Sequence, residues 1–276
     1  MIKAGLKVLI NYPISGEVFK GVGVSACIFS IDKHTSDNNF KYKRIEDGKV
    51  VNEYESTINI GDIIAESKYE LDIPKHIIFN KSMGDISLGV KTFWIGVNGR
   101  IGFDGKGDFI SISPIEFENS IKIKNKINGF VDVDYIAKDD IPKGHEYIDL
   151  YKVICPYKIS KKSLTSFEKA EILYPKYICT EGWAVVGAFS SIAEASNCIK
   201  YLNSRLFKFL CYIFCSNGMT AVTKVLLSHV PLQDFTSNSD IDWSQSITDI
   251  DQQLYKKYNL TEEEIAYIEQ TIKPMA

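Results

Sequence analysis

Runs of β-branched and aromatic residues, separated by turn-forming residues, occupy much of the chain before Ser191. In Ile121–Lys126 isoleucine and lysine alternate, which predicts a strand with one buried and one solvated face. Short apolar runs bounded by turn residues favour strands in the same way. The other runs that meet this criterion are Lys7–Ile10, Val22–Ile31, Ile148–Pro156 and Trp183–Phe189.

Glycines punctuate residues 73–115 too densely for helices. Glycine tolerates the positive backbone angles that tight hairpin turns require, so this spacing predicts a series of hairpins. The apolar runs that would form their strands are Ile77–Phe79, Thr92–Ile95 and Phe109–Ile112. The glycines stand at positions 84, 89, 96, 99, 102, 105 and 107.

After Ser191 the period changes to that of a helix. Ser191 is a suitable N-cap, and Glu194 stands three residues later, where it would complete a capping box. Apolar residues then recur every three or four positions, which predicts one helix of ~25 residues ending at Gly218. These residues are Ala195, Ile199, Leu202, Leu206, Phe209 and Ile213.

The C-terminal segment reads as a two-helix tail. Thr261 and Glu264 have the spacing of a capping box at the start of the second helix. Leu260 and Ile265 occupy the two positions of a hydrophobic staple, and Pro274 stops the helix. The predicted fold class is therefore α+β, with a β-rich region, a long helix and a two-helix C-terminal tail.

Composition indicates a soluble globular protein. Of the 276 residues, 45% are hydrophobic and 24% are charged. No apolar run reaches the ~18 residues of a membrane span, and the N-terminus lacks a signal-peptide pattern. The six cysteines form no C-x-x-C pair, which favours buried free thiols in a reducing cytoplasm over a metal site or a disulfide. We therefore expect a cytoplasmic protein that makes no membrane contact.

The formal net charge of −3 argues against a nucleic-acid partner at first sight. However, residues 236–276 hold three basic and eight acidic residues, a net charge of −5. Residues 71–180 hold sixteen basic and fourteen acidic residues, and residues 151–176 hold six lysines against two glutamates. This distribution allows a local DNA-facing surface without proving one.

Catalytic motifs are missing from the sequence. It contains no P-loop, no G-x-G-x-x-G, no G-x-S-x-G and no H-E-x-x-H. The four histidines are isolated from one another, and the acidic pairs Asp132/Asp134 and Asp139/Asp140 fit polar loops better than a metal site. Asp104-Gly105-Lys106 has the Asp-x-Lys spacing of a nuclease motif but is flanked by glycine and reads as a turn. We therefore predict neither catalytic nor metal-binding residues.

Several segments together resemble one family. The C-terminal end of the chain, from His229–Phe235 through the tail, resembles that of large type II restriction-modification proteins that methylate adenine in DNA. Further segments with this resemblance are Tyr12–Pro13, Gly89–Thr92, Gly129–Asp132, Ile148–Val153 and Cys179–Glu181. The resemblance implies three regions: a remnant of the terminal strands of the methyltransferase domain (1–70), a target-recognition domain (71–235) and a helical tail (236–276).

The family's Asn-Pro-Pro-Tyr motif and its S-adenosylmethionine loop are not in this sequence. We therefore expect this chain to lack methyltransferase activity by itself and to bind no cofactor. S-adenosylmethionine would belong to a partner or to an upstream domain. The expected partners are double-stranded DNA and a catalytic methyltransferase domain or subunit. Self-association is also expected, through strands 7–10 and 22–31. The candidate DNA contacts are Lys91, Thr92, Arg100, Lys152, Lys158, Lys161 and Lys162.

An alternative of another class is open. The chain would then be a protein-interaction module that docks a partner through its long helix and its C-terminal tail. The net negative charge favours this alternative, whereas the lysine-rich residues 151–176 favour DNA recognition. A third and weaker alternative is a remnant of an enzyme without a present function.

Overall fold

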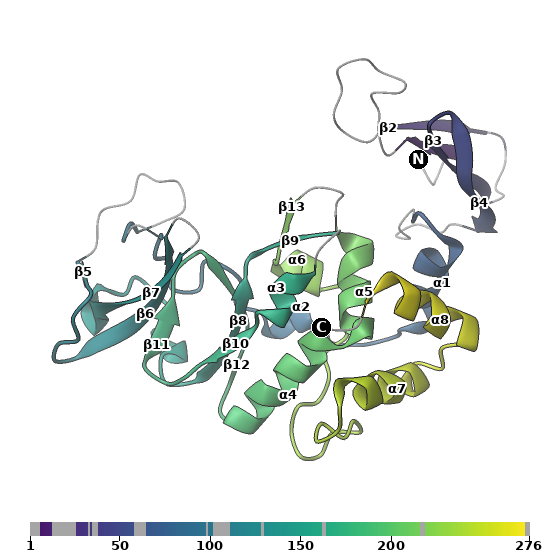
Figure 1. Ribbon diagram of the computed structural model, residues 1–276. Coiled ribbons are helices and arrows are strands. Elements are labelled where there is room, and N and C mark those ends of the chain that lie inside the picture. The colour runs from purple at the N-terminus through teal and green to yellow at the C-terminus, as the bar shows by residue number, and fades with distance from the viewer. Residues whose placement is uncertain are drawn as a thin grey trace. The chain divides into compact units, whose positions relative to one another are not determined.

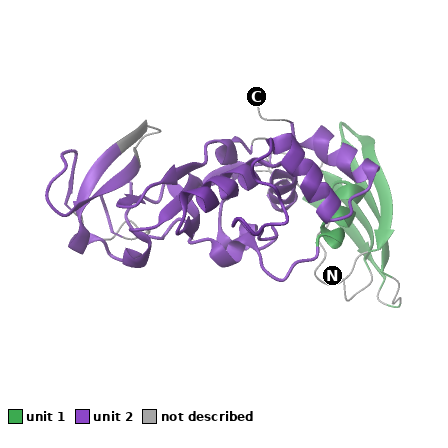
Figure 2. Cartoon of the chain, turned by 90° about the horizontal axis from the view of Figure 1, so that it is seen from below, with its two compact units in different colours: residues 1–77 green, residues 78–276 purple. Residues whose placement is uncertain are grey.

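A computed structural model of the chain shows a mixed α+β protein (Figure 1). This confirms the predicted fold class. The chain divides into two compact units, Met1–Ile77 and Ile78–Ala276 (Figure 2). The structure describes residues 6–12, 26–32, 34, 38–57, 65–97, 99–101, 111–127, 130–161, 164–215 and 219–273.

The described residues of the first unit form a four-stranded sheet and one helix. The strand order is β2-β1-β3-β4, with β1 and β3 parallel and the other two pairs antiparallel. The predicted strand Lys7–Ile10 is confirmed, and Val22–Ile31 is confirmed from Ala26 onward, because its first residues lie outside the described part. The elements are β1 (Leu6–Tyr12), β2 (Ala26–Ile31), β3 (Asn39–Glu46), β4 (Lys49–Thr57) and α1 (Lys68–His76).

One face of this sheet is apolar and packs under α1. Leu9, Phe40 and Tyr42 are buried there together with Leu71 of α1, and the hydroxyl of Tyr54 donates to the carbonyl of Ala65 at 2.6 Å. The strand β2 is left more exposed, since Ile28 and Phe29 of that strand have exposed fractions of 46% and 45%. Exposed apolar residues on a strand are a route to association, and self-association remains a prediction.

Three sheets and a layer of helices make up the second unit. The sheet orders are β11-β6-β7-β5, β10-β8-β12 and β13-β9. The strands are β5 (Ile112–Ser113), β6 (Ser120–Ile127), β7 (Phe130–Ala137), β8 (Tyr151–Pro156), β9 (Lys158–Ser160), β10 (Glu171–Leu173), β11 (Tyr177–Cys179), β12 (Trp183–Phe189) and β13 (Met219–Ala221). The helices are α2 (Met83–Ile86), η3 (Lys138–Asp140), η4 (His145–Tyr147), α3 (Thr165–Glu168), α4 (Ile192–Asn203), α5 (Arg205–Phe214), α6 (Lys224–Leu227), α7 (Ile247–Lys257) and α8 (Glu262–Thr271).

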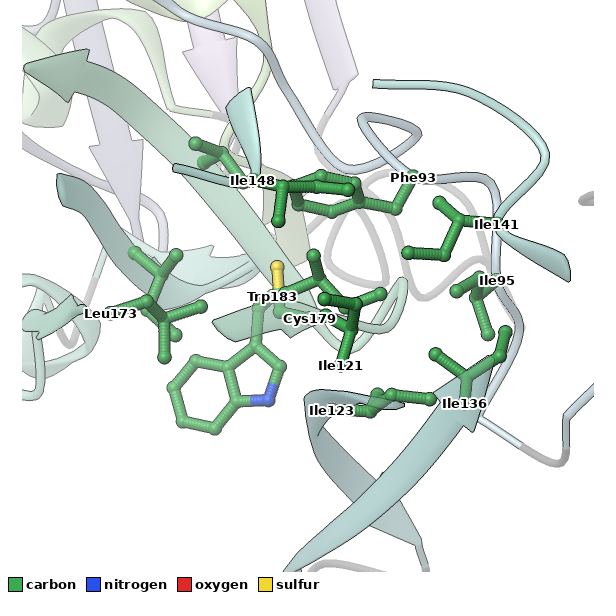
Figure 3. Packing of buried hydrophobic residues seen from close by; sticks show 13 residues of the cluster. Phe93, Ile95, Ile121, Ile123, Ile136, Ile141, Ile148, Leu173, Cys179 and Trp183 are labelled. Atoms are coloured by element: carbon green, nitrogen blue, oxygen red, sulfur yellow. The ribbon is translucent and has the colours of Figure 1, made fainter. Parts of the chain in front are cut away.

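The strands predicted from alternation and from short apolar runs are confirmed in this unit. Ile121–Lys126 lies within β6, Trp183–Phe189 is β12, and Ile148–Pro156 contains β8, which begins at Tyr151. Ile121 and Ile123 of β6 are buried, as the alternating pattern required. They belong to an apolar core that joins two of the sheets (Figure 3) and also contains Phe93, Ile95, Ile136, Ile141, Ile148, Ile154, Leu173, Ile178, Cys179, Trp183 and Val185.

The prediction of one long helix after Ser191 was wrong, because the chain forms two helices, α4 and α5. Ser204 separates them with an extended backbone (φ −63°, ψ 148°). Its hydroxyl accepts the amide of Phe207 at 3.2 Å, and Asp251 of α7 accepts the amide of Arg205 at 2.7 Å. A serine that caps a new helix start competes with continuation of the previous helix. The second helix ends at Phe214, and Gly218 lies outside the described residues.

Asp251 caps α5 from another element and is buried, with 1% of its surface exposed. Burial raises its pKa from 3.8 to about 7, although the amides of Arg205 and Leu206 act to lower it. Between these two pKa values the folded chain binds more protons than the unfolded chain. This carboxyl group therefore makes stability fall as the pH rises through that range.

Replacing Asp251 with asparagine removes this titration and keeps an oxygen acceptor for the amides. We expect the free energy of unfolding of Asp251→Asn to fall less than that of the parent between about pH 4.5 and pH 8, by on the order of 1–3 kcal/mol. Urea denaturation at both pH values measures the difference. The exposed Asp149→Asn is the control. A profile for Asp251→Asn that matches the parent's would contradict the assignment.

The two-helix tail is confirmed as α7 and α8. The predicted capping box is present, because the amide of Thr261 donates to Glu264 at 2.9 Å and the amide of Glu264 donates to the hydroxyl of Thr261 at 3.3 Å. Both helices pack on α5 (Figure 1), and Arg205 pairs with Glu269 at 2.8 Å. The staple between Leu260 and Ile265 stays a prediction, and Pro274 lies outside the described residues.

The six cysteines are free thiols, and the prediction that they are buried is confirmed for five of them. Five are buried and Cys27 is exposed. Burial raises the pKa of Cys155 and of Cys179 to about 12, so neither is reactive as a thiolate at neutral pH. Among the described residues, none of the helices has both the length and the apolar character needed to cross a membrane.

Candidate nucleic-acid interface

In its described residues, the glycine-rich region does not form the predicted series of hairpins. Ile77–Phe79 and Thr92–Ile95 are not strands, and Gly84 lies in the helix α2. A Cβ atom at Gly84 would lie 2.6 Å from the carbonyl oxygen of Lys224, so this glycine serves close packing. A tight turn is present at Gly96, where the amide of Gly99 donates to the carbonyl of Gly96 at 3.0 Å and Ile95 pairs with Ile101 in an isolated bridge. The stretch 102–110 lies outside the described residues, with its glycines and with Phe109–Ile110.

The motif near the end of the chain anchors the start of this region. Ser82 pairs with Pro231 in an isolated bridge. The amide of Met83 donates to the carbonyl of Val230 at 2.8 Å, and the amide of Leu232 donates to the carbonyl of Lys81 at 2.9 Å. The most recognisable stretch of the sequence therefore has an architectural role: it fixes the segment that leads into residues 89–101.

Residues 89–101, here named the recognition segment, begin with a turn. Gly89 has a positive φ of 75° and exchanges two backbone hydrogen bonds with Val185 of β12, both of 3.0 Å. The hydroxyl of Thr92 donates to the carbonyl of Gly89 at 2.9 Å and closes the turn. Thr92 is 7% exposed, so it shapes the segment and does not present its hydroxyl to DNA. Lys91 and Arg100 of the same segment are exposed.

Glu181 joins the recognition segment to a second motif that is distant in sequence. Its amide donates to the carbonyl of Ile95 at 3.0 Å. Burial raises the pKa of its carboxyl group, while the amide of Val97 and the charge of Lys91 act to lower it. A Cβ atom at Gly96 would lie 3.3 Å from this carboxylate, so glycine allows the close approach. The family resemblance singled out both segments but gave no indication that they touch.

Trp94 and Lys143 were not among the predicted site residues. Trp94 has a positive φ of 59° and an exposed fraction of 43%. The ammonium group of Lys143 lies 5.2 Å from the centre of the indole ring. In the sequence, Trp94 reads as one more apolar residue of a strand. Its neighbours Phe93 and Ile95 are buried, and the sequence carries no sign of its positive φ.

The prediction that Lys152 contacts a phosphate was wrong. Its side chain is buried, and its ammonium group donates to the carbonyls of Tyr147, Ile148 and Leu150 at 2.9, 2.9 and 2.7 Å. Burial lowers its pKa to about 8, and the three carbonyl oxygens occupy all three ammonium hydrogens. Lys152 therefore satisfies the carbonyl groups around η4 and does not reach a ligand outside the protein.

The remaining candidates belong to the small sheet β13-β9 and its end. Lys158 is exposed on β9, with its ammonium group 5.4 Å from the ring centre of Tyr157. Lys161 is half-buried and lies 4.5 Å over the ring of Tyr212. Lys162 lies outside the described residues. The structure thus places Lys91 and Arg100 on one segment, and Lys158 and Lys161 on another.

Within the part of the chain that the structure describes, no three His, Cys, Asp or Glu residues are close enough to hold a metal ion. The side chains at the recognition segment are of kinds that can bind a ligand through charge, stacking and hydrogen bonds. It offers exposed cations, one exposed aromatic ring and one partly buried carboxylate. No known family model and no curated protein matches this sequence.

Proposed function

We propose that residues 78–276 recognise a sequence in double-stranded DNA on behalf of an adenine methyltransferase. The observation that carries the proposal is that Glu181 joins two of the motifs that resemble the family. Its amide donates to the carbonyl of Ile95, in the segment that follows Gly89–Thr92, and its carboxylate accepts the amide of Val97 and is influenced by the charge of Lys91. In this proposal the Asn-Pro-Pro-Tyr motif and the S-adenosylmethionine site belong to a separate catalytic domain or subunit.

The exposed groups of the recognition segment suit this role. Arginine recognises guanine edges in the major groove, lysine neutralises phosphates, and a carboxylate accepts the amino group of cytosine. Arg100 and Lys91 of the segment are exposed and supply the first two. The partly buried Glu181, which contacts the segment from another part of the chain, supplies the carboxylate. Turns at Gly89 and Gly96 and the buried neighbours Phe93 and Ile95 hold them on a fixed backbone. Fixed geometry lowers the conformational entropy lost on binding.

Two substitutions test the segment. We expect Lys91→Glu to weaken binding to all duplexes alike and to reduce the slope of log affinity against log salt by about one, since one phosphate contact is lost. Arg100→Ala instead changes the sequence preference, by ~1–3 kcal/mol at one base pair. Fluorescence anisotropy, with duplexes first selected from a random pool, measures both effects.

The second basic segment serves as the comparison. The sequence predicts that a variant with Lys158, Lys161 and Lys162 all changed to glutamate also weakens binding to every duplex. Parental binding by this triple variant, together with loss in Lys91→Glu, would restrict the DNA contact to the recognition segment. Parental affinity, salt dependence and sequence preference in all of these variants would contradict the proposal and favour a protein-interaction module.

The structure offers less support for docking through the long helix and the tail. Leu206, Leu210, Ile250, Leu254 and Ile268 of α5, α7 and α8 are buried within the second unit itself. These apolar side chains are therefore not available to a partner in this fold.

A further inference from the structure

Trp94 is held at the surface by a backbone conformation that is unfavourable for its residue type. A bulky residue with positive φ is strained and persists only where its surroundings enforce that conformation. Here the enforcing residues are Phe93 and Ile95, each 1% exposed in the core of the second unit (Figure 3). With both neighbours buried, the left-handed turn at φ 59° leaves the indole of Trp94 43% exposed.

A second segment supports the ring. Gly144 packs so closely that a Cβ atom there would lie 2.7 Å from the carbonyl of Thr92 and 3.0 Å from the ring of Phe93. This packing fixes the preceding residue, Lys143, whose ammonium group lies 5.2 Å from the indole centre. Such a cation–π contact restrains the ring and adds a positive charge beside its exposed surface.

We propose that the exposed indole of Trp94 is a stacking site for a nucleobase that has left the duplex stack. The inference rests on the proposed function, because it assigns a part of the same DNA surface. Bases inside a duplex are already stacked on one another, so an aromatic side chain stacks on single-stranded, mismatched or extruded bases. The exposed cations Lys91, Arg100 and Lys143 on the same and adjoining segments favour an anionic partner. A single flat ring suits a base better than an apolar peptide.

The test compares two duplexes of the same sequence. One is fully paired, and the other carries 2-aminopurine opposite an abasic site, which leaves this base unpaired. We expect the full chain to prefer the second duplex by roughly 5- to 150-fold, the range of one base–aromatic stacking contact. Trp94→Ala should lose this preference, so that the ratio of its affinities for the two duplexes falls to about one. Trp94→Phe should retain most of the preference.

Intrinsic fluorescence gives a readout that needs no variant. Trp183 and Trp243 are 4% and 5% exposed, so Trp94 is the exposed tryptophan of the three. Stacking of an unpaired base should quench its emission and remove its accessibility to acrylamide. Circular dichroism of Trp94→Ala checks that the fold is intact.

The outcomes separate the two proposals. Equal affinity of the parent for both duplexes, or a preference that survives in Trp94→Ala, overturns the stacking site and leaves duplex recognition in place. Displacement of the DNA by an acidic peptide that quenches Trp94 equally well also overturns it, in favour of a protein partner. A parent chain that binds neither duplex overturns the proposed function and the stacking site together.

Discussion

Glu168→Ala is expected to lower the free energy of unfolding by about 3 kcal/mol, because it leaves the buried charge of Lys208 without its partner. The ammonium group of Lys208 on α5 pairs with the carboxylate of Glu168 on α3 at 2.9 Å, and the lysine side chain is only 3% exposed. Removing one member of a buried pair costs far more than the pair itself contributes, since the other charge remains away from water.

The second half of the pair supplies the decisive comparison. Changing Lys208 to methionine in the Glu168→Ala background removes the unpaired charge, so most of the lost stability should return. Asp240→Ala is the matched control, because its partner Lys257 is 29% exposed and surface pairs contribute under about 1 kcal/mol. Chemical denaturation followed by tryptophan fluorescence measures all three. A double variant no more stable than Glu168→Ala would show that the charge is not the cause.

Phe93→Ala is expected to cost about 3–5 kcal/mol, the usual range for removing a phenyl ring from a packed core. Phe93 is 1% exposed and belongs to the cluster shown in Figure 3. The same ring packs beside Gly144. In the sequence, Phe93 lies between Thr92 and Trp94 of the recognition segment. Its loss should therefore also loosen the recognition segment and weaken DNA binding, measured by anisotropy at a temperature where the variant is still folded.

The exposed Phe117→Ala provides the control, since Phe117 is 43% exposed and its truncation removes little buried surface. If Phe93→Ala lowers stability but binds DNA with parental affinity, then the recognition segment does not depend on its core anchor. The proposal for residues 89–101 would lose its structural basis in that case.

Local patterns predicted much of the fold. The alternation in Ile121–Lys126 and the apolar run Trp183–Phe189 located β6 and β12, because burial on one or both faces of a sheet leaves a direct trace in the sequence. The capping box of α8 could also be predicted, because both of its partners lie within four residues of the sequence.

The errors arose where a distant residue decides the outcome. The break at Ser204 depends on Asp251 of α7, which accepts the first amide of α5. The burial of Lys152 depends on the carbonyl groups around η4. The residue type alone does not indicate whether a lysine is surrounded by such acceptors. The contact of Glu181 with the recognition segment, and the outward position of Trp94, follow from tertiary packing that periodicity does not encode.

The hydrogen bonds from Met83 to Val230 and from Leu232 to Lys81 have a consequence for protein engineering. They tie the start of the second unit to the stretch that precedes the helical tail, so residues 82–101 depend on a part of the chain that is distant in sequence. A transplant of residues 82–101 into another scaffold would leave behind Val230–Leu232, the stretch that pairs with it. Under the proposed function, an exchange of specificity between two such proteins would therefore have to carry Val230–Leu232 along with the segment, or use a host with a paired stretch in the same register.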